Sequence, residues 1–379
     1  MKGSVVFTGN WWANHQPVMP ARLVRHFIKA GVCFACLQAA VMPGYSQGAQ
    51  FWADTSILKI TLEGPVRRLL ADRGANPAYH TLKFGYTSAA GAATAFTLKA
   101  RCRGNFRRER ENCNFPPILL NFPKNDTVKA SLFKGANKLK LVMPCRRGDF
   151  VAREYLIYKM YNLLTPYSFK VRLAELVLKG PGLRSAEEEP MLCFLIEEET
   201  DLAKRAGENK GDSLGYQPAA SHFKNFAPMA IFQFMIANVD WSLPYRHNIR
   251  TIMPKGSPQV IPVPYDFDHA GLVFAPYAQP PEALEMQSVQ ERKFRGACLS
   301  SMQPYAEALE GFKANQEAFY TLYRQCSYIG EGYRRQALKF LDEFFAIIAV
   351  PKRWEAAFYE ACRTGTQIQV GGLKMGKEQ

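Results

Sequence analysis

The order of strand-like and helix-like segments is the feature that most limits how this chain can fold. Seven short β-rich runs occupy residues 57–199 and are separated by Gly, Asn and Pro. One segment among them, residues 149–164, has helical periodicity instead, with Asp149 as a plausible N-cap and Pro166 beyond its end. Strands followed by helices, rather than alternating with them, predict an α+β fold.

The second half of the chain is mainly helical. Residues 225–239 are typical of a buried helix, and two short runs after it predict a hairpin. Further helices are expected over residues 304–326, 332–348 and 353–362. We therefore expect two lobes with a cleft between them and a hinge near residues 197–206: a β-rich N-lobe over 51–199 and a mainly helical C-lobe over 200–379.

The first fifty residues have the pattern of an export signal. Basic residues at 22, 25 and 29 precede an apolar run from Ala30 to Met42, and small and polar residues follow. Residues 1–20 then form an upstream extension. The alternative is a buried N-terminal helix. A signal ending near residue 50 predicts a secreted or periplasmic protein, and no later stretch is long and apolar enough for a membrane span.

Charge and cysteine content narrow the partners and the type of site. The formal net charge of +15 favours an anionic partner, although a solvated basic surface explains it equally well. Nucleic acid is not expected as a partner if the chain is exported. Nine cysteines are present, two of them within the predicted signal. The others contain no CxxC spacing, so the sequence does not indicate a zinc site. In an oxidising compartment the expected pairings are Cys102–Cys113 and Cys298–Cys326, with Cys193 or Cys145 left as a free thiol.

Two neighbouring stretches gather oxygen-bearing side chains. NVDWSLPYRHN, residues 238–248, leaves the buried helix in a loop because Pro244 lacks the amide that a helix needs. VPYDFDHAG, residues 263–271, ends the following hairpin. This arrangement can bring Asp240, Asn248, Asp266 and Asp268 together. Clustered carboxylates and an amide oxygen suit Mg²⁺ or Mn²⁺ with substrate phosphates, and a remaining Asp can act as base.

These paired motifs resemble those of the CotH-type spore-coat kinases, which belong with the HipA-like kinases to the atypical protein-kinase-like group. The VPYDFD block is closer still to uncharacterised secreted Bacteroidetes proteins. The segment LKARCRGNFRRE, residues 98–109, is similar to the family's RGN loop, and the order of the blocks agrees over about residues 95–275. The resemblance implies an atypical protein-kinase-like two-lobe fold and an ATP-dependent phosphotransferase.

The resemblance also implies roles for single residues. Asp240 corresponds to the catalytic base, Asn248 and Asp266 to metal ligands, and Asp268 to a neighbour or second ligand. The positions that correspond to the nucleotide site are Lys138 or Lys140, Glu154, Arg103 and Glu197. In that site Lys138 or Lys140 would bind the phosphates, and Glu154 would pair with this lysine. The spacing from Asp240 to Asn248 exceeds that of ordinary protein kinases. Gly104 is the one candidate for a phosphate-loop glycine, so Arg103 or Arg107 would have to supply positive charge.

Each of these features has a simpler reading. Asp240 can be a turn residue at a helix end, the Asp266–Asp268 turn can cap a strand, and His247 can be a loop hydrogen-bonder. Lys138 and Lys140 can line a solvated edge strand. The acids at 197–199 can be ordinary residues of a helix N-terminus.

The leading hypothesis is an exported kinase-like enzyme that uses ATP and Mg²⁺ or Mn²⁺ on a hydroxyl of a protein or glycan. The alternatives are an inactive kinase-like protein that binds an anionic glycan or a phosphorylated partner and, less favoured, a metal-dependent hydrolase or glycosidase built on Asp266 and Asp268.

Overall fold

The computed structural model describes residues 51–363, apart from residues 90, 147, 212–214, 217 and 219–220. The predicted signal and the upstream extension lie outside the described residues. The chain is a mixed fold in which strands come first and helices follow, as the order of segments predicts. The described residues belong to one compact unit. The division into two lobes, and the boundary near residue 200, stay predictions.

Seven strands of the described chain form a closed barrel, which the sequence analysis did not foresee. Their order around the barrel is β1-β2-β3-β4-β5-β7-β6, and a parallel pair between β1 and β6 closes it. The strands are β1 (Leu58–Glu63), β2 (His80–Thr87), β3 (Ala93–Cys102), β4 (Ile118–Asn121), β5 (Lys138–Val142), β6 (Val171–Lys179) and β7 (Met191–Ile196). Closure leaves no free edge within this sheet, so the alternative reading of Lys138 and Lys140 as residues of a solvated edge strand is wrong.

Alternation along β5 decides which of its side chains face the barrel interior. Leu139 and Leu141 belong to the apolar cluster inside the barrel, whereas Val142 belongs to the cluster shared with the helices. Lys138 and Lys140 therefore point to the outer face. The same alternation in β7 sends Phe194 outward.

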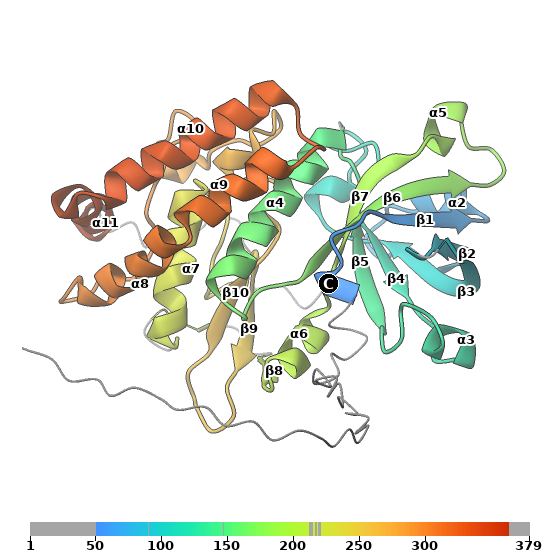
Figure 1. Ribbon diagram of the computed structural model, residues 1–379, viewed down its shortest axis with the longest axis horizontal. Helices are drawn as coiled ribbons and strands as arrows, with labels where there is room; N and C mark the ends of the chain where they lie inside the picture. Colours follow the sequence, from blue (N-terminus) through green and yellow to red (C-terminus); the bar gives the residue numbers. More distant parts are fainter. Residues whose placement is uncertain are drawn as a thin grey trace, which may run out of the picture. The chain divides into compact units, whose positions relative to one another are not determined.

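The helix α4 (Gly148–Leu164) joins the barrel to the later helices. It packs on β6 and β7 on one side and on α9 (Gln316–Gln325) on another, as Figure 1 shows. Shorter elements surround the barrel and follow it: α2 (Val66–Ala71), η1 (Phe106–Arg108), α3 (Asp126–Lys129), α5 (Ser185–Glu188), α6 (Glu199–Arg205) and β8 (Asn209–Gly211).

The C-terminal half contains the expected buried helix, hairpin and helices. The helix α7 (Phe223–Met235) is buried along most of its length, and β9 (Ile249–Met253) pairs with β10 (Ile261–Pro264) as the predicted hairpin. The helix expected over residues 304–326 is divided at Asn315. The remaining elements are η3 (Gly271–Val273), η4 (Glu282–Leu284), α8 (Gln303–Ala314), α10 (Glu331–Ile348) and α11 (Pro351–Arg363). No helix in the described ranges combines the length and apolarity needed to cross a membrane.

The disulfide expectations are wrong for both predicted pairs. Cys113 forms a disulfide with Cys145 instead, and Cys102 is a buried free thiol. Cys298 is disulfide-bonded, but Cys326 is free, so these two do not pair. Cys193 is free and buried, in agreement with one of the two alternatives.

Candidate functional site

The loop after α7 turns back on itself and returns to Asp240. Asn238 begins the turn by accepting the Asp240 amide at 3.1 Å. Ser242 and His247 then exchange backbone hydrogen bonds of 2.9 and 3.0 Å, which close a small hairpin. This hairpin explains how Asn248 meets Asp240 although eight positions separate them in sequence.

Both carboxylate oxygens of Asp240 have partners. His247 Nε2 lies 2.8 Å from Asp240 Oδ1, and Asn248 Nδ2 donates to Asp240 Oδ2 at 2.9 Å. Burial alone would raise the pKa of Asp240, but the hydrogen bond and charge of His247, with the charges of His269 and Arg295, lower it overall. The side chain keeps 38% of its surface exposed, so the ionised carboxylate can reach a substrate.

Asn248 is buried in a left-handed backbone conformation, with a φ of 50°, which Asn tolerates better than most residues. Its amide nitrogen is used on Asp240, both on the side chain and on the backbone carbonyl at 2.8 Å. Its Oδ1 has no hydrogen-bond partner among the described residues. An unused amide oxygen is a ligand type that Mg²⁺ and Mn²⁺ accept.

The hairpin of β9 and β10 brings Asp266 next to this pair. The amide of Tyr265 donates to the Asn248 carbonyl at 3.0 Å, and the amide of Asp266 donates to the Tyr158 hydroxyl at 2.8 Å. Asp266 also reaches His247 electrostatically. Burial lowers the pKa of His247, but the Asp240 hydrogen bond and the charges of Asp240 and Asp266 raise it overall. Asp266 therefore follows directly after the residue that is hydrogen-bonded to Asn248, and it is close enough to His247, the partner of Asp240, to change its pKa.

The segment after Asp266 is pinned to the end of α7. The amides of Gly271 and Leu272 donate to the carbonyls of Ala237 and Ile236 at 3.0 and 3.1 Å. A Cβ at Gly271 would lie 2.4 Å from the Val289 carbonyl oxygen and 2.9 Å from the Ala237 Cβ, so this approach requires glycine. The glycine of the VPYDFDHAG block therefore fixes the distance between the two motif loops.

Asp268 turns into the protein. Its carboxylate is buried, accepts a 3.3 Å hydrogen bond from the Tyr277 hydroxyl and lies 3.7 Å from Arg107 Nε. Burial raises the pKa of Asp268, and Arg107 opposes that shift. Within the described chain, no group of three or more His, Cys, Asp and Glu side chains is arranged to hold a metal. Among the described residues, no hydrogen bond or ion pair engages Asn248 Oδ1 or the Asp266 carboxylate, so these oxygen atoms remain available as ligands.

Of the two candidate lysines, Lys140 is the buried one, with 6% of its surface exposed. Its Nζ makes no hydrogen bond or ion pair with another described residue and lies 5.2 Å from the centre of the Tyr265 ring and 5.5 Å from that of the Phe169 ring. Burial lowers the pKa of Lys140 to about 7, the charges of Arg103 and Arg250 add to this effect, and Glu198 and Glu199 oppose it.

The buried amine predicts a pH-dependent contribution to stability. The Lys140 pKa is about 7 in the folded protein, whereas an exposed lysine has a pKa of 10.5, so between these two pH values the unfolded chain binds one proton more. The cost of burying the charge is full below pH 7 and is lost above pH 10.5. Between pH 7 and pH 9, the free energy of unfolding of wild type, measured with urea, should rise by about 2 kcal/mol relative to that of Lys140→Met.

The control for this prediction is Lys138→Met, because Lys138 shares the strand and the face but is only half buried. Measured in the same way, it should leave the pH dependence of wild type in place. An identical pH response in wild type and Lys140→Met would contradict the prediction.

Glu154 was expected to pair with a lysine of β5. The structure shows that it does not. Its Oε2 instead lies 2.9 Å from Arg107 Nη1, and both side chains are almost fully buried. Burial raises the pKa of Glu154, and the positive charge of Arg107 opposes this. Arg107, considered from the sequence only as a source of charge near Gly104, is therefore the actual partner.

Arg103 and Glu197 have different surroundings. Arg103 is half buried and lies near enough to Lys140 and Tyr265 to influence the pKa of both. Glu197 is buried, and both of its carboxylate oxygens accept hydrogen bonds from Arg205 at 2.9 and 3.0 Å. Glu198 caps α6 by accepting the Glu199 amide, which agrees with the simpler reading of these acids as residues of a helix N-terminus.

Arg295 is a site residue that the sequence analysis missed. Its guanidinium donates to the carbonyls of Val239 and Trp241, one on each side of Asp240, the latter at 2.8 Å. Burial lowers the pKa of Arg295 to about 10, and the charge of Asp240 opposes this. Arg295 lies more than fifty positions from Asp240 in a segment without periodicity, so no local sequence pattern predicts that it belongs to the site.

Comparisons with known proteins give little beyond this geometry. No family model and no curated protein matches the chain. Among solved structures, the chain is similar to the Helicobacter pylori proinflammatory kinase CtkA, with a TM-score of 0.34 and 10% sequence identity, over 69% of this chain and 96% of that one. This weak similarity to a kinase assigns no family, so the resemblance to CotH-type and Bacteroidetes proteins stays a prediction.

Proposed function

We propose that the protein is a kinase-like phosphotransferase that transfers the γ-phosphate of ATP to a hydroxyl group of a protein or glycan, with Mg²⁺ or Mn²⁺. The observation that carries the proposal is the 2.9 Å hydrogen bond from Asn248 to Asp240 beside Asp266. It supports an arrangement in which one loop supplies both a base and an oxygen ligand and a second loop supplies a carboxylate. Phosphoryl transfer requires these parts in this proximity.

Each residue has a definite task in this proposal. Asp240 accepts the proton of the attacking hydroxyl, since its carboxylate is ionised and partly exposed. Asn248 Oδ1 and Asp266 hold the divalent ion, which neutralises charge on the transferred phosphate. Two protein oxygens fit a Mg²⁺ site that takes its other ligands from water and phosphates. Lys140 and Arg103 contact the nucleotide phosphates.

The direct test uses the purified full chain with γ-labelled ATP, Mg²⁺ or Mn²⁺, and a mixture of protein and glycan acceptors. Label should transfer only when nucleotide and metal are both present. ATP with metal should also raise the melting temperature, because a ligand that binds only the folded state stabilises it. If neither metal produces ATP binding or transfer, the enzyme proposal is wrong.

A second function is favoured by the pairing of Glu154 with Arg107 instead of Lys140. This pairing departs from the arrangement that the resemblance implies for an active enzyme and suits a catalytically inactive protein that binds an anionic glycan or a phosphorylated partner. Such binding would weaken steeply with salt and would be unchanged in Asp240→Ala and Asp266→Ala. Export, predicted from residues 1–50, belongs to both proposals.

A further inference from the structure

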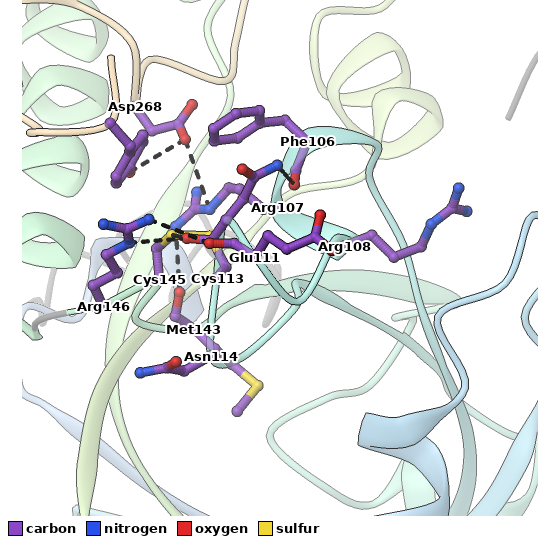
Figure 2. Close-up of a disulfide and its surroundings, with 12 residues drawn as sticks. Phe106, Arg107, Arg108, Glu111, Cys113, Asn114, Met143, Cys145, Arg146 and Asp268 are labelled. Atoms are coloured by element: carbon purple, nitrogen blue, oxygen red, sulfur yellow. Dashed lines mark hydrogen bonds and ion pairs between the residues drawn. A yellow bond between two sulfur atoms is a disulfide. The ribbon is translucent and has the colours of Figure 1, made fainter.

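A buried charge cluster joins three separate parts of the chain next to the candidate site. Arg107 comes from the loop after β3, Glu154 from α4 and Asp268 from the turn after β10. Arg107 lies 2.9 Å from Glu154 and 3.7 Å from Asp268, and it also donates to the Met143 carbonyl at 3.3 Å. Figure 2 shows Arg107 between Asp268 and the segment that carries Met143. One cation thus serves two buried carboxylates from different elements.

The loop that carries Arg107 is firmly attached to the barrel. The Cys113–Cys145 disulfide ties it to the segment before α4, and the Asn114 amide donates to the Cys145 carbonyl at 2.8 Å (Figure 2). Arg146 holds the carbonyls of Asn112 and Glu111 at 3.1 and 3.3 Å. The loop that carries Arg107 is therefore restrained by a covalent bond and by several hydrogen bonds, and the Arg107 side chain extends from it into the protein interior.

The other end of the cluster is connected to Asp266. The Asp266 amide donates to Tyr158, one turn beyond Glu154 on α4. The Phe267 ring lies 4.8 Å from that of Tyr158 and 5.9 Å from that of Phe232. Asp266, Phe267 and Asp268 are thus held by α4 on one side and by Arg107 on the other. Arg107 and α4 thus contact the two ends of the same three-residue turn.

We propose that Arg107 is the positioning residue of this site: it takes the place of a strand lysine as the partner of Glu154, holds Asp268 so that Asp266 faces Asn248, and leaves Lys140 unpaired to bind the anionic ligand. The part of this inference that concerns the ligand rests on the proposed phosphotransferase function. The part that concerns Arg107, Glu154 and Asp268 does not.

The experiment compares Arg107→Met, Arg107→Lys and the control Arg110→Met, which removes an exposed arginine from the same loop. The Asp266 amide donates to Tyr158, and the Ala270 amide donates to the Phe267 carbonyl at 2.9 Å. Hydrogen exchange on the full chain should show both amides exchanging roughly tenfold faster in Arg107→Met. Arg107→Lys should restore part of the protection because it keeps the charge without the fork. Arg110→Met should match wild type.

Kinetics supply the second readout. Arg107→Met should lower kcat roughly 10- to 100-fold while the KM for ATP changes little, whereas Lys140→Met should mainly raise that KM. Combining Arg107→Met with Glu154→Gln should lose little more than either change alone, because the two act as a unit. Combining Lys140→Met with Glu154→Gln should multiply the separate losses.

The outcomes separate this inference from the proposed function. Unchanged exchange at Asp266 and Ala270 in Arg107→Met would overturn the positioning role, whatever the activity. So would coupling of Glu154 to Lys140 rather than to Arg107. Absence of phosphate transfer in wild type would overturn the proposed function alone, since exchange still tests the cluster. If Arg107→Met does not fold, Arg107→Lys is compared with wild type by the same exchange measurement.

Discussion

Asp240→Asn should lower the rate of phosphate transfer by a factor of about 10² to 10⁴, with little change in the KM for ATP. The asparagine keeps the size of the side chain and can still contact His247 and Asn248, but it cannot accept the hydroxyl proton. The loop itself should hold its shape, because its backbone bonds between Ser242 and His247 do not involve the carboxylate. Initial rates over a range of ATP concentrations measure the effect.

Asp72→Asn is the matched control for this change. Asp72 also contacts a histidine, with 3.1 Å between Asp72 Oδ2 and His80 Nε2, and 29% of its side-chain surface is exposed. It lies between α2 and β2 of the barrel, far along the chain from the two motif loops. A general weakening from the loss of an Asp–His pair would affect both variants. Equal activity in Asp240→Asn and wild type would contradict the base role.

Removal of the Cys113–Cys145 disulfide is expected to give the largest loss of stability. The bond closes a loop of 32 residues, and its removal restores conformational freedom to the unfolded chain. The loop-entropy relation predicts a loss of about 4 kcal/mol in the free energy of unfolding of Cys113→Ala/Cys145→Ala. Because the bond also ties down the neighbouring segment that carries Arg107, the loss should coincide with faster exchange near Asp268. Urea unfolding under non-reducing conditions measures the stability.

The control for the disulfide is Cys102→Ala/Cys193→Ala, which removes two buried sulfur atoms that form no cross-link. Its loss reports the packing contribution of sulfur alone, so the cross-link contributes the difference between the two double variants. If the two double variants lose the same amount, the bond adds nothing beyond packing.

Much of the fold was predictable because it depends on local patterns. The alternation of β2, the periodicity of α4 and the apolar length of α7 each predict an element that the structure contains. The closure of the barrel was not predictable in this way. It requires β1 to pair in parallel with β6, more than a hundred residues away, and no local signal specifies that pairing.

The candidate site was also predictable only where it depends on local sequence patterns. Asp240, Asn248 and Asp266 were identified from the sequence because two short loops flank one helix and one hairpin, and these elements bring the loops together. The partner of Glu154 was predicted wrongly. Choosing between Lys140 and Arg107 depends on which cation reaches the buried carboxylate, and that follows from the packing of the Arg107 loop against α4.

The sequence by itself determined the kinds of elements, their order and the side chains that meet within neighbouring loops, because period and turn chemistry act over a few residues. Only the tertiary structure decided the closed barrel, the Cys113–Cys145 bond, the burial of Lys140 and the contacts of Arg107 and Arg295. Each of these joins residues that are distant along the chain. Their energies come from desolvation and paired charge, which arise only once the distant parts exclude water together.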